Sequence, residues 1–381
     1  MNLLRRAARF VKRRLVPPAP SAAKLVRAKV QGLDLTDPAV AADPFPHFEA
    51  LRSRGPVQRL GAPAGWIVLG YDAAKEAMAR PDLFSNAPYR EVDAVLLGED
   101  PPRQAAVRKV VARLFTADSM RRLEAVAERT ARGALKPQMD AVAGFAQPVS
   151  RAVAADLIGF DAKALAGISA AADAAAGQPL SALIAALDAF GTRAAVYSQL
   201  LEGGEGLIGE AEARSLVRLL WLASNTTTER VISRCVLRLV EAPEVQASIR
   251  ADRALLAPFI EEVMRLHAPE HILPRVAVAD AVLGGEAIGA GEAVFVCVGA
   301  ANRDPAHFHA PGRLMLEREA KRHFAFGSGI HHCVGAPLAR RVVAAALGAL
   351  LDGAPELRLI AEPESFSNLT SVSPSRLEIG L

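Results

Sequence analysis

Residues 323–340 decide the fold and read His-Phe-Ala-Phe-Gly-Ser-Gly-Ile-His-His-Cys-Val-Gly-Ala-Pro-Leu-Ala-Arg. They place one thiol, Cys333, after a glycine-rich loop and before a segment, residues 334–350, whose alanine, leucine and valine content and early proline predict a helix. Gly327 and Gly329 permit turns that are closed to other residues, so backbone amides can point at the sulfur. These amides and the positive end of the helix both favour the thiolate over the thiol.

This stretch resembles the haem-binding signature of the cytochrome P450 family, Phe-Gly-x-Gly-x-x-x-Cys-x-Gly. The matching residues are Phe326, Gly327, Gly329, Cys333 and Gly335. The resemblance implies that Cys333 binds the iron of haem b (iron protoporphyrin IX), where a cysteine thiolate promotes O–O cleavage. Gly335 removes a side chain that would collide with a group bound to the sulfur. A zinc site is a poor alternative, because His-His-Cys lacks a second ligand pair at a workable spacing.

Two other segments support the resemblance. Glu262 and Arg265 lie three residues apart and therefore share one face of a helix. They match the family's Glu-x-x-Arg motif, which implies a buried pair that is hydrogen-bonded to the segment before the cysteine loop. Arg303 lies in Asn-Arg-Asp-Pro, residues 302–305, and resembles the family segment whose arginine completes this network.

The two propionates of a haem need cationic or donor groups, and the guanidinium fork suits a carboxylate. The resemblance implies Arg108, Arg275 and His331 as the propionate ligands. Gln104 stands where many bacterial members have a histidine propionate ligand. Glutamine still donates a neutral hydrogen bond, so we expect weaker anchoring rather than loss of haem.

A helix is predicted over about residues 210–241, which at about 1.5 Å per residue is long enough to cross the domain. The family pattern on such a helix is Ala-Gly-x-(Asp/Glu)-Thr-Thr, and here residues 223–228 read Ala-Ser-Asn-Thr-Thr-Thr. A serine therefore replaces the glycine, and a threonine replaces the acid that normally relays protons for oxygen activation. The residues predicted to relay protons or organise a water chain are Ser224, Asn225, Thr226 and Thr227.

This departure leaves several hypotheses open. Protons arrive through water or a polar group of the substrate, or the enzyme performs an atypical oxidation, such as coupling or a peroxide-dependent reaction. A rival from another class is a haem-bearing interaction protein that recruits a partner. A structural alternative is that the threonine hydroxyls bond back one turn upstream. We favour a haem-thiolate monooxygenase that inserts one oxygen atom from O2 into a substrate.

The substrate is expected to be a small or medium apolar organic molecule. Between residues 160 and 223 the chain is shorter than is usual for the family, and this region lids the cavity there. The positions predicted to contact the substrate are Ala223, Thr226, Thr227, Tyr89, Val92, His271, Ile272 and Leu273.

The composition is typical of one large domain, because 51% of the 381 residues are hydrophobic and no linker divides the body. The predicted fold class is mainly α with small β-sheets, including a hairpin within residues 57–69, in a P450 domain over residues 31–381. Three cysteines give no disulfide framework, which favours a reducing cytoplasm.

The formal net charge of +4 depends on a basic tail, residues 1–30, which holds nine of the 45 basic residues and no acid. The remaining body has 36 basic and 41 acidic groups, so the net charge of −5 argues against nucleic-acid binding. Residues 1–16 carry apolar side chains at helical spacing and suit an anionic membrane surface. A disordered leader or a start codon assigned too far upstream explains them equally well.

Electrons are expected from a small acidic ferredoxin that docks on the cysteine side of the domain. The basic residues predicted to contact it are Arg108, Lys109, Arg113, Arg340 and Arg341. Ordinary solvated charge is the competing interpretation of these five residues.

Overall fold

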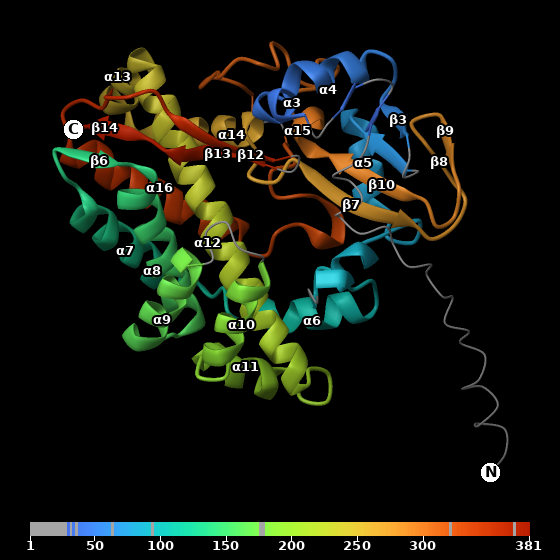
Figure 1. The fold of residues 1–381 in the computed structure, drawn as a ribbon, viewed down its shortest axis with the longest axis horizontal. Helices are drawn as coiled ribbons and strands as arrows, with labels where there is room; N and C mark the ends of the chain where they lie inside the picture. The colour runs from blue at the N-terminus through green and yellow to red at the C-terminus, as the bar shows by residue number, and fades with distance from the viewer. Residues whose placement is uncertain are drawn as a thin grey trace.

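The computed structural model describes residues 29–30, 33–34, 37–61, 65–92, 95–174, 180–319, 322–368 and 371–381. The segment predicted to lie on a membrane, residues 1–16, falls outside these ranges. Long helices and small sheets make up the fold (Figure 1), which confirms the predicted mainly α class. None of the helices in the described ranges combines the length and the apolarity that spanning a bilayer requires.

The bounds of the described helices and strands place every segment of the candidate site. The helices are α3 (Pro38–Ala42), α4 (Phe45–Arg52), α5 (Tyr71–Ala79), η1 (Ala87–Val92), α6 (Arg103–Ala112), α7 (Ala117–Ala134), η2 (Val142–Ala146), α8 (Gln147–Ile158), α9 (Ala162–Ala174), α10 (Leu180–Gly191), α11 (Ala195–Gly203), α12 (Glu210–Glu241), α13 (Pro243–Ala251), η3 (Arg253–Leu255), α14 (Leu256–Leu266), α15 (Val298–Ala301), η4 (Gly329–His331) and α16 (Ala336–Gly353). The strands are β1 (Lys29–Val30), β2 (Leu33–Asp34), β3 (Val57–Leu60), β4 (Gly65–Val68), β5 (Phe84–Ser85), β6 (Gln138–Asp140), β7 (Ile272–Ala277), β8 (Ala281–Leu283), β9 (Glu286–Ile288), β10 (Ala293–Cys297), β11 (Arg358–Leu359), β12 (Glu364–Asn368), β13 (Ser371–Arg376) and β14 (Glu378–Gly380).

The long helix α12 crosses the molecule (Figure 1) and has the bounds predicted from the sequence. Its first turn is stabilised by the Glu212 carboxylate, which accepts a 3.0 Å hydrogen bond from the Gly209 amide. It packs against α8 and α16, while α7 packs against the same two helices. The shared core includes the fully buried Phe145, Ile232 and Leu347. Because α16 begins three residues after Cys333, this bundle fixes one end of the cysteine loop.

The main sheet has the strand order β3-β4-β10-β7-β5, with β10 parallel to β4 and the other neighbours antiparallel. The antiparallel pair β3 and β4 confirms the predicted hairpin. Side chains alternate between the two faces of the sheet, so Val68 packs with Met78 of α5 while Ile67 packs with Phe48 of α4. The strand β7 thereby carries one set of its side chains toward the α5 face, where the cysteine loop lies.

His271 and Ile272 do not fit the prediction that they contact a substrate. Ile272 lies in the core on the α4 face of the sheet, together with Ile67 and Phe48. The His271 ring is fully buried, 5.3 Å from the Phe45 ring centroid, and neither of its nitrogens has a hydrogen-bond partner in the described part of the chain. Neither side chain leaves surface for a ligand, because Ile272 packs on the α4 face of the sheet and His271 is buried against Phe45.

Buried His271 should make folding stability depend on pH. Burial, reinforced by the charges of Arg303, Arg234 and Arg230, lowers the pKa of His271 to about 3. The unfolded chain takes up this proton below about pH 6.5 and the folded chain does not, so stability falls as pH drops toward 3. His271→Phe should make the slope of unfolding free energy shallower by about 1.4 kcal/mol per pH unit.

Urea unfolding measured between pH 4.5 and pH 6.5 checks this expectation. Phe45→Leu is the matched control, because it removes the ring against His271 without removing a titratable group, and it should lower stability equally at every pH. An unchanged slope in His271→Phe would contradict the prediction.

Candidate functional site

The cysteine loop depends on two glycines with left-handed backbone. Gly327 has φ +67° and Gly329 has φ +68°, conformations that residues with a Cβ rarely adopt. A Cβ on Gly329 would also lie 2.3 Å from the Met78 carbonyl oxygen of α5, so the loop lies directly against that helix. The Cys333 amide donates a 2.9 Å hydrogen bond to the Phe326 carbonyl and closes the loop. The structure thus has the glycine turns that the sequence predicts.

The Cys333 sulfur accepts hydrogen bonds from the backbone amides of Gly335 and Ala336, as the position before a helix predicts. The side chain is exposed, yet burial is the largest influence on it and raises the pKa of the thiol. The amides and the charges of Arg108 and Arg340 lower this pKa but do not outweigh burial. The Cys333 side chain is therefore accessible, although the protein around it removes most of the water from the sulfur.

The amides thus favour the thiolate, as the sequence predicts, but burial, which the sequence does not indicate, opposes them and has the larger effect on the pKa. A bound metal ion deprotonates a coordinating thiol. The loop supplies hydrogen bonds that stabilise the anion once the sulfur is coordinated.

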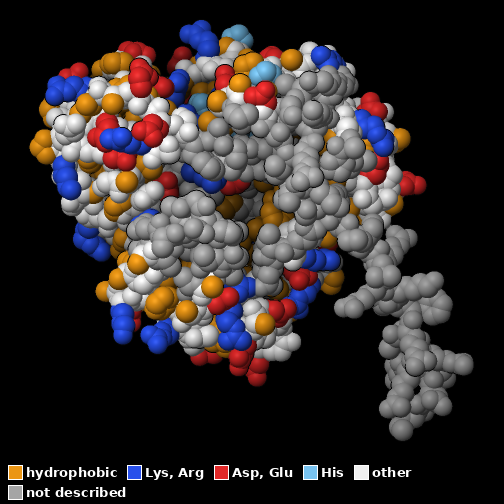
Figure 2. Space-filling model, in the orientation of Figure 1, with side chains coloured by type: hydrophobic (Ala, Val, Ile, Leu, Met, Phe, Trp, Pro, Cys, Tyr) orange, Lys and Arg blue, Asp and Glu red, His pale blue; other side chains and the backbone are white. Residues whose placement is uncertain are grey.

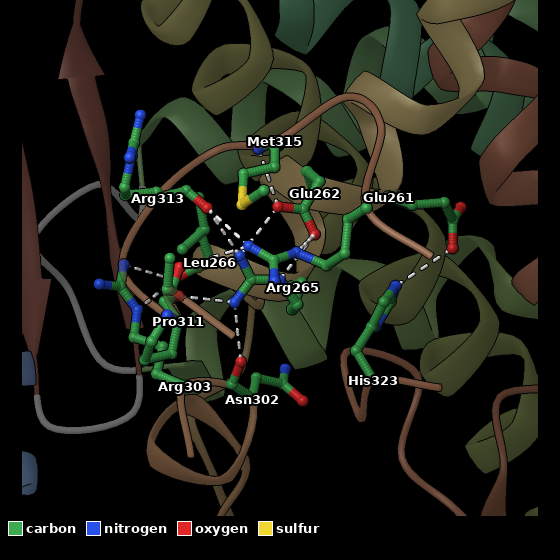
Figure 3. A network of polar contacts seen from close by, with 12 residues as sticks. Glu261, Glu262, Arg265, Leu266, Asn302, Arg303, Pro311, Arg313, Met315 and His323 are labelled. Atoms are coloured by element: carbon green, nitrogen blue, oxygen red, sulfur yellow. Dashed lines mark hydrogen bonds and ion pairs between the residues drawn. The ribbon is translucent and has the colours of Figure 1, made fainter. Parts of the chain in front are cut away.

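Glu262 and Arg265 of α14 form the buried pair that their spacing implies. Their side chains join through two hydrogen bonds of 2.7 Å and 2.9 Å (Figure 3), and Arg265 is 1% exposed. Arg265 also donates to three carbonyl oxygens, those of Asn302, Pro311 and Arg313. Since these residues precede the cysteine loop, the pair holds the chain that leads into it.

The third member of this network is Arg318 rather than Arg303. Arg318 donates to Glu262 at 2.9 Å and to the carbonyls of His309, Ala310 and Arg313. Arg303 instead donates twice to the Leu266 carbonyl and lies 3.6 Å above the Phe45 ring. The prediction that Arg303 joins the ion pair is wrong because its side chain turns to the carboxyl end of α14 (Figure 3). Arg318 carries no motif in the sequence, so pattern reasoning missed it.

A second network ties α14 to both ends of the cysteine loop. Glu261 accepts two hydrogen bonds from Arg340 of α16, at 2.7 Å and 2.9 Å, and lies 3.1 Å from His323 (Figure 3). Burial alone would raise the pKa of Glu261, but His323 and Arg340 outweigh it and lower the pKa to about 2. The Arg340 guanidinium also lies 4.4 Å above the Phe326 ring. The sequence contains these residues without any indication that they meet.

The three predicted propionate ligands carry donors that lack protein acceptors. Arg275 is 3% exposed, and its one hydrogen bond to a described residue goes to the Pro274 carbonyl. Arg108 makes neither a hydrogen bond nor an ion pair with any described residue, and the buried Nε2 of His331 has no partner there either. Burial, then the charges of Arg275 and Arg108, lower the pKa of His331 to about 3, so the three groups lie near one another.

This concentration of positive charge without a bonded carboxylate fits a ligand that brings two carboxylates. The residues present therefore fit haem, with Cys333 toward its iron and these donors toward its propionates. Gln104 is also buried, but its amide donates to the Ile330 carbonyl at 2.9 Å and so ties α6 to the cysteine loop.

In the middle of α12, two hydroxyls bond back one turn upstream. Ser224 donates to the Leu220 carbonyl at 2.5 Å, and Thr227 donates to the Ala223 carbonyl at 2.6 Å. The Asn225 side chain accepts a 2.9 Å hydrogen bond from Ser150 of α8. The Thr227 oxygen therefore presents its lone pairs, not its proton, to a neighbouring molecule.

The remaining predicted substrate contacts lie in separate elements. Ala223 is exposed although it lies in the middle of α12, and Leu273 packs near Gly327 in the cysteine loop. Tyr89 lies on η1 near Arg275, and burial raises its pKa to about 12. Val92 ends η1, but its side chain falls outside the described residues. Figure 2 shows that this face of the molecule is hollowed near its centre, with hydrophobic side chains visible there.

The basic residues predicted to meet a ferredoxin are not all available. Arg340 is held by Glu261, and Arg341 bonds to Glu124 at 2.9 Å. Figure 2 also shows Lys and Arg side chains interspersed with Asp and Glu on the described surface that faces the viewer. No group of histidine, cysteine and acidic side chains in the described ranges could hold a metal ion by itself.

Comparisons with known proteins agree with this arrangement. The family model described as Cytochrome P450 matches residues 194–353. The chain is 33% identical to the cytochrome P450 monooxygenase PikC of Streptomyces venezuelae, over 85% of this chain and 86% of that protein. It is 32% identical to the vitamin D3 dihydroxylase of Streptomyces griseolus, over 82% and 86%. The crystal structure of CYP109E1 from Bacillus megaterium in complex with corticosterone superposes with a TM-score of 0.81 at 26% identity, over 90% of this chain and 99% of that one.

Removing Arg265 should cost far more stability than removing Arg303. Arg265→Met leaves a buried carboxylate with one remaining arginine and takes the Arg265 donor from the carbonyls of Asn302 and Pro311, and we expect a loss of about 3–5 kcal/mol. Arg303→Met removes two bonds to one carbonyl and a ring contact, and we expect about 1–2 kcal/mol. Denaturant unfolding of both variants measures the difference, and equal losses would contradict the network described above.

Removing Arg275 should loosen haem while stabilising the protein without haem. Arg275→Leu eliminates a buried charge that lacks an anion, but it also removes a charge-assisted hydrogen bond to a propionate. We expect haem to leave at least about tenfold faster. Transfer of haem to apomyoglobin measures the rate, and Arg341→Leu, which removes a surface ion pair, is the control. A wild-type rate in Arg275→Leu would reject its role at a propionate.

Proposed function

The chain belongs to the cytochrome P450 family, and on that premise we propose that it inserts one oxygen atom from O2 into a small or medium apolar organic substrate. The family's cofactor is haem b, and its members are oxidoreductases. The proposal depends on one observation: the Cys333 side chain is exposed just before α16, and its sulfur accepts hydrogen bonds from two backbone amides. We propose that residues 31–381 form the P450 domain.

Each segment of the site has one role in this proposal. When bound, haem supplies the iron at which oxygen chemistry occurs. Cys333 would hold the iron through its sulfur, and the amides of Gly335 and Ala336 would stabilise the negative charge of that sulfur. The donors of Arg108, Arg275 and His331 neutralise the propionates, and Gln104 holds the loop beside them through Ile330.

On the distal side, α12 provides space and an acceptor. Exposed Ala223 would leave room for a substrate beside α12, and Leu273 would add an apolar contact from β7. The Thr227 oxygen can accept a hydrogen bond from a bound water or substrate, because its own proton is engaged with the Ala223 carbonyl. This arrangement orients a hydrogen-bonded molecule but does not store a proton.

The apolar substrate class is supported by the relatives. One relative is described as a vitamin D3 dihydroxylase, and a structure of similar fold was solved in complex with corticosterone. The hydrophobic side chains in the hollow of Figure 2 suit such molecules. We place the enzyme in the cytoplasm with a ferredoxin as electron donor, and residues 1–16 on a membrane surface.

Replacing the axial cysteine should abolish the spectroscopic signature of a thiolate ligand. Cys333→Ser should lose the long-wavelength band that the reduced, haem-loaded wild-type protein develops with carbon monoxide when the iron has a thiolate ligand, and with it oxygen insertion into the substrate. Difference spectra after haem loading measure the band, and Cys235→Ala, in the core, is the matched control. Survival of the band in Cys333→Ser, or its absence from the wild type, would reject the proposed function.

A further inference from the structure

Glu229 is a carboxyl group on α12 to which the proposed function gives no role. The residue lies two positions after Thr227 and is half-buried. Its side chain bonds to that of Gln147 at the start of α8, and no ion pair joins it to another described residue. A carboxyl group in the interior without a paired cation is costly to keep ionised.

Glu229 belongs to a polar cluster between α8 and α12. Fully buried Ser150 donates to the Asn225 side chain at 2.9 Å and lies 3.1 Å from the Gln147 carbonyl. The cluster thus connects Gln147, which meets Glu229, to the segment of α12 that carries the predicted proton relay. The two helices pack closely along this contact.

Helical spacing relates Glu229 to the relay directly. Glu229 follows Thr226 by three residues and Asn225 by four, so the three side chains share one face of α12. The Thr226 hydroxyl makes no hydrogen bond within the described chain, whereas the Thr227 hydroxyl donates to a carbonyl. Thr226 is therefore the hydroxyl on this face that is available to accept a proton and pass one on.

The surroundings keep the carboxyl group protonated closer to neutral pH. Burial raises the pKa of Glu229 and outweighs the charge of Arg230, the hydrogen bond of Gln147 and the charge of Arg151. These are the groups that face it from its own helix and from α8. A carboxylic acid whose pKa is raised by its surroundings holds its proton more readily and can donate it in catalysis.

We propose that Glu229 is the proton reservoir of this site and replaces, one turn along α12, the acid that the family pattern has at position 226. The Glu229 carboxyl gives its proton to Thr226 Oγ1 while Thr226 releases its own hydroxyl proton to water in the cavity. Solvent then reprotonates the carboxylate. The inference rests on the proposed function. In that reaction the substrate takes up one oxygen atom of O2, and the other atom becomes water with two protons and two electrons from a ferredoxin. Glu229 acts through Thr226 and is thus a positioning residue.

The test uses the haem-loaded enzyme with a surrogate ferredoxin, its reductase and NADPH. Oxygen reduction without added substrate needs no knowledge of the substrate, and Glu229→Gln should slow it about 10- to 100-fold and enlarge the solvent deuterium isotope effect. Glu241→Gln, the same change at the end of the same helix, should leave the rate unchanged. Adding Thr226→Glu to Glu229→Gln should restore the rate, which a merely structural role of Glu229 would not predict.

Infrared spectroscopy gives a measurement independent of turnover. During a pH titration the wild type should show a protonated carboxyl band that persists to higher pH than those of exposed carboxyl groups, shifts in D2O, moves in Glu229→Asp and is missing in Glu229→Gln. Absence of this band, or a wild-type rate and isotope effect in Glu229→Gln, overturns the proposal. If the wild type reduces no oxygen, the proposed function fails separately, and the infrared band then decides whether Glu229 holds a proton.

Discussion

The buried ion pair of Glu262 and Arg265 is the interaction on which the site depends. Two charges removed from water are stable only when hydrogen bonds occupy the rest of their polar atoms. Here Arg318 and the Met315 amide complete the carboxylate, while three carbonyls before the cysteine loop complete the guanidinium. The chain that leads to Cys333 is therefore held by polar contacts whose loss would leave buried charges unpaired.

The cysteine site is electrostatically incomplete without its cofactor. Burial raises the pKa of the Cys333 thiol, and Arg108, Arg275 and His331 present donors that lack a carboxylate among the described residues. A haem resolves both features, because its iron takes up the thiolate charge and its propionates accept from the donors. Binding energy and folding energy are therefore linked in this protein, since the same ligand satisfies groups on α6, β7 and the cysteine loop.

The distal helix shows how a function can be preserved when one residue of its pattern changes. Threonine at position 226 cannot store a proton, but the polar contact between α8 and α12 places a carboxyl group one turn away. That contact exists because Ser150 and Gln147 of α8 satisfy polar atoms of α12 inside the core. In this proposal, reactivity at the cofactor depends on packing between α8 and α12.

The sequence by itself determined the elements whose signals are local: the cysteine loop, the helix after it, the span of α12, the hairpin of β3 and β4, and the pairing of Glu262 with Arg265. Neighbouring residues decide these through glycine conformation, periodicity and helical spacing. Only the tertiary structure decided which arginine completes the ion pair, which side of β7 Ile272 faces, and that Glu229 meets Gln147. Each of these depends on contacts between segments far apart in the chain, and on burial, which also outweighs the expected effect of the amides on the pKa of Cys333.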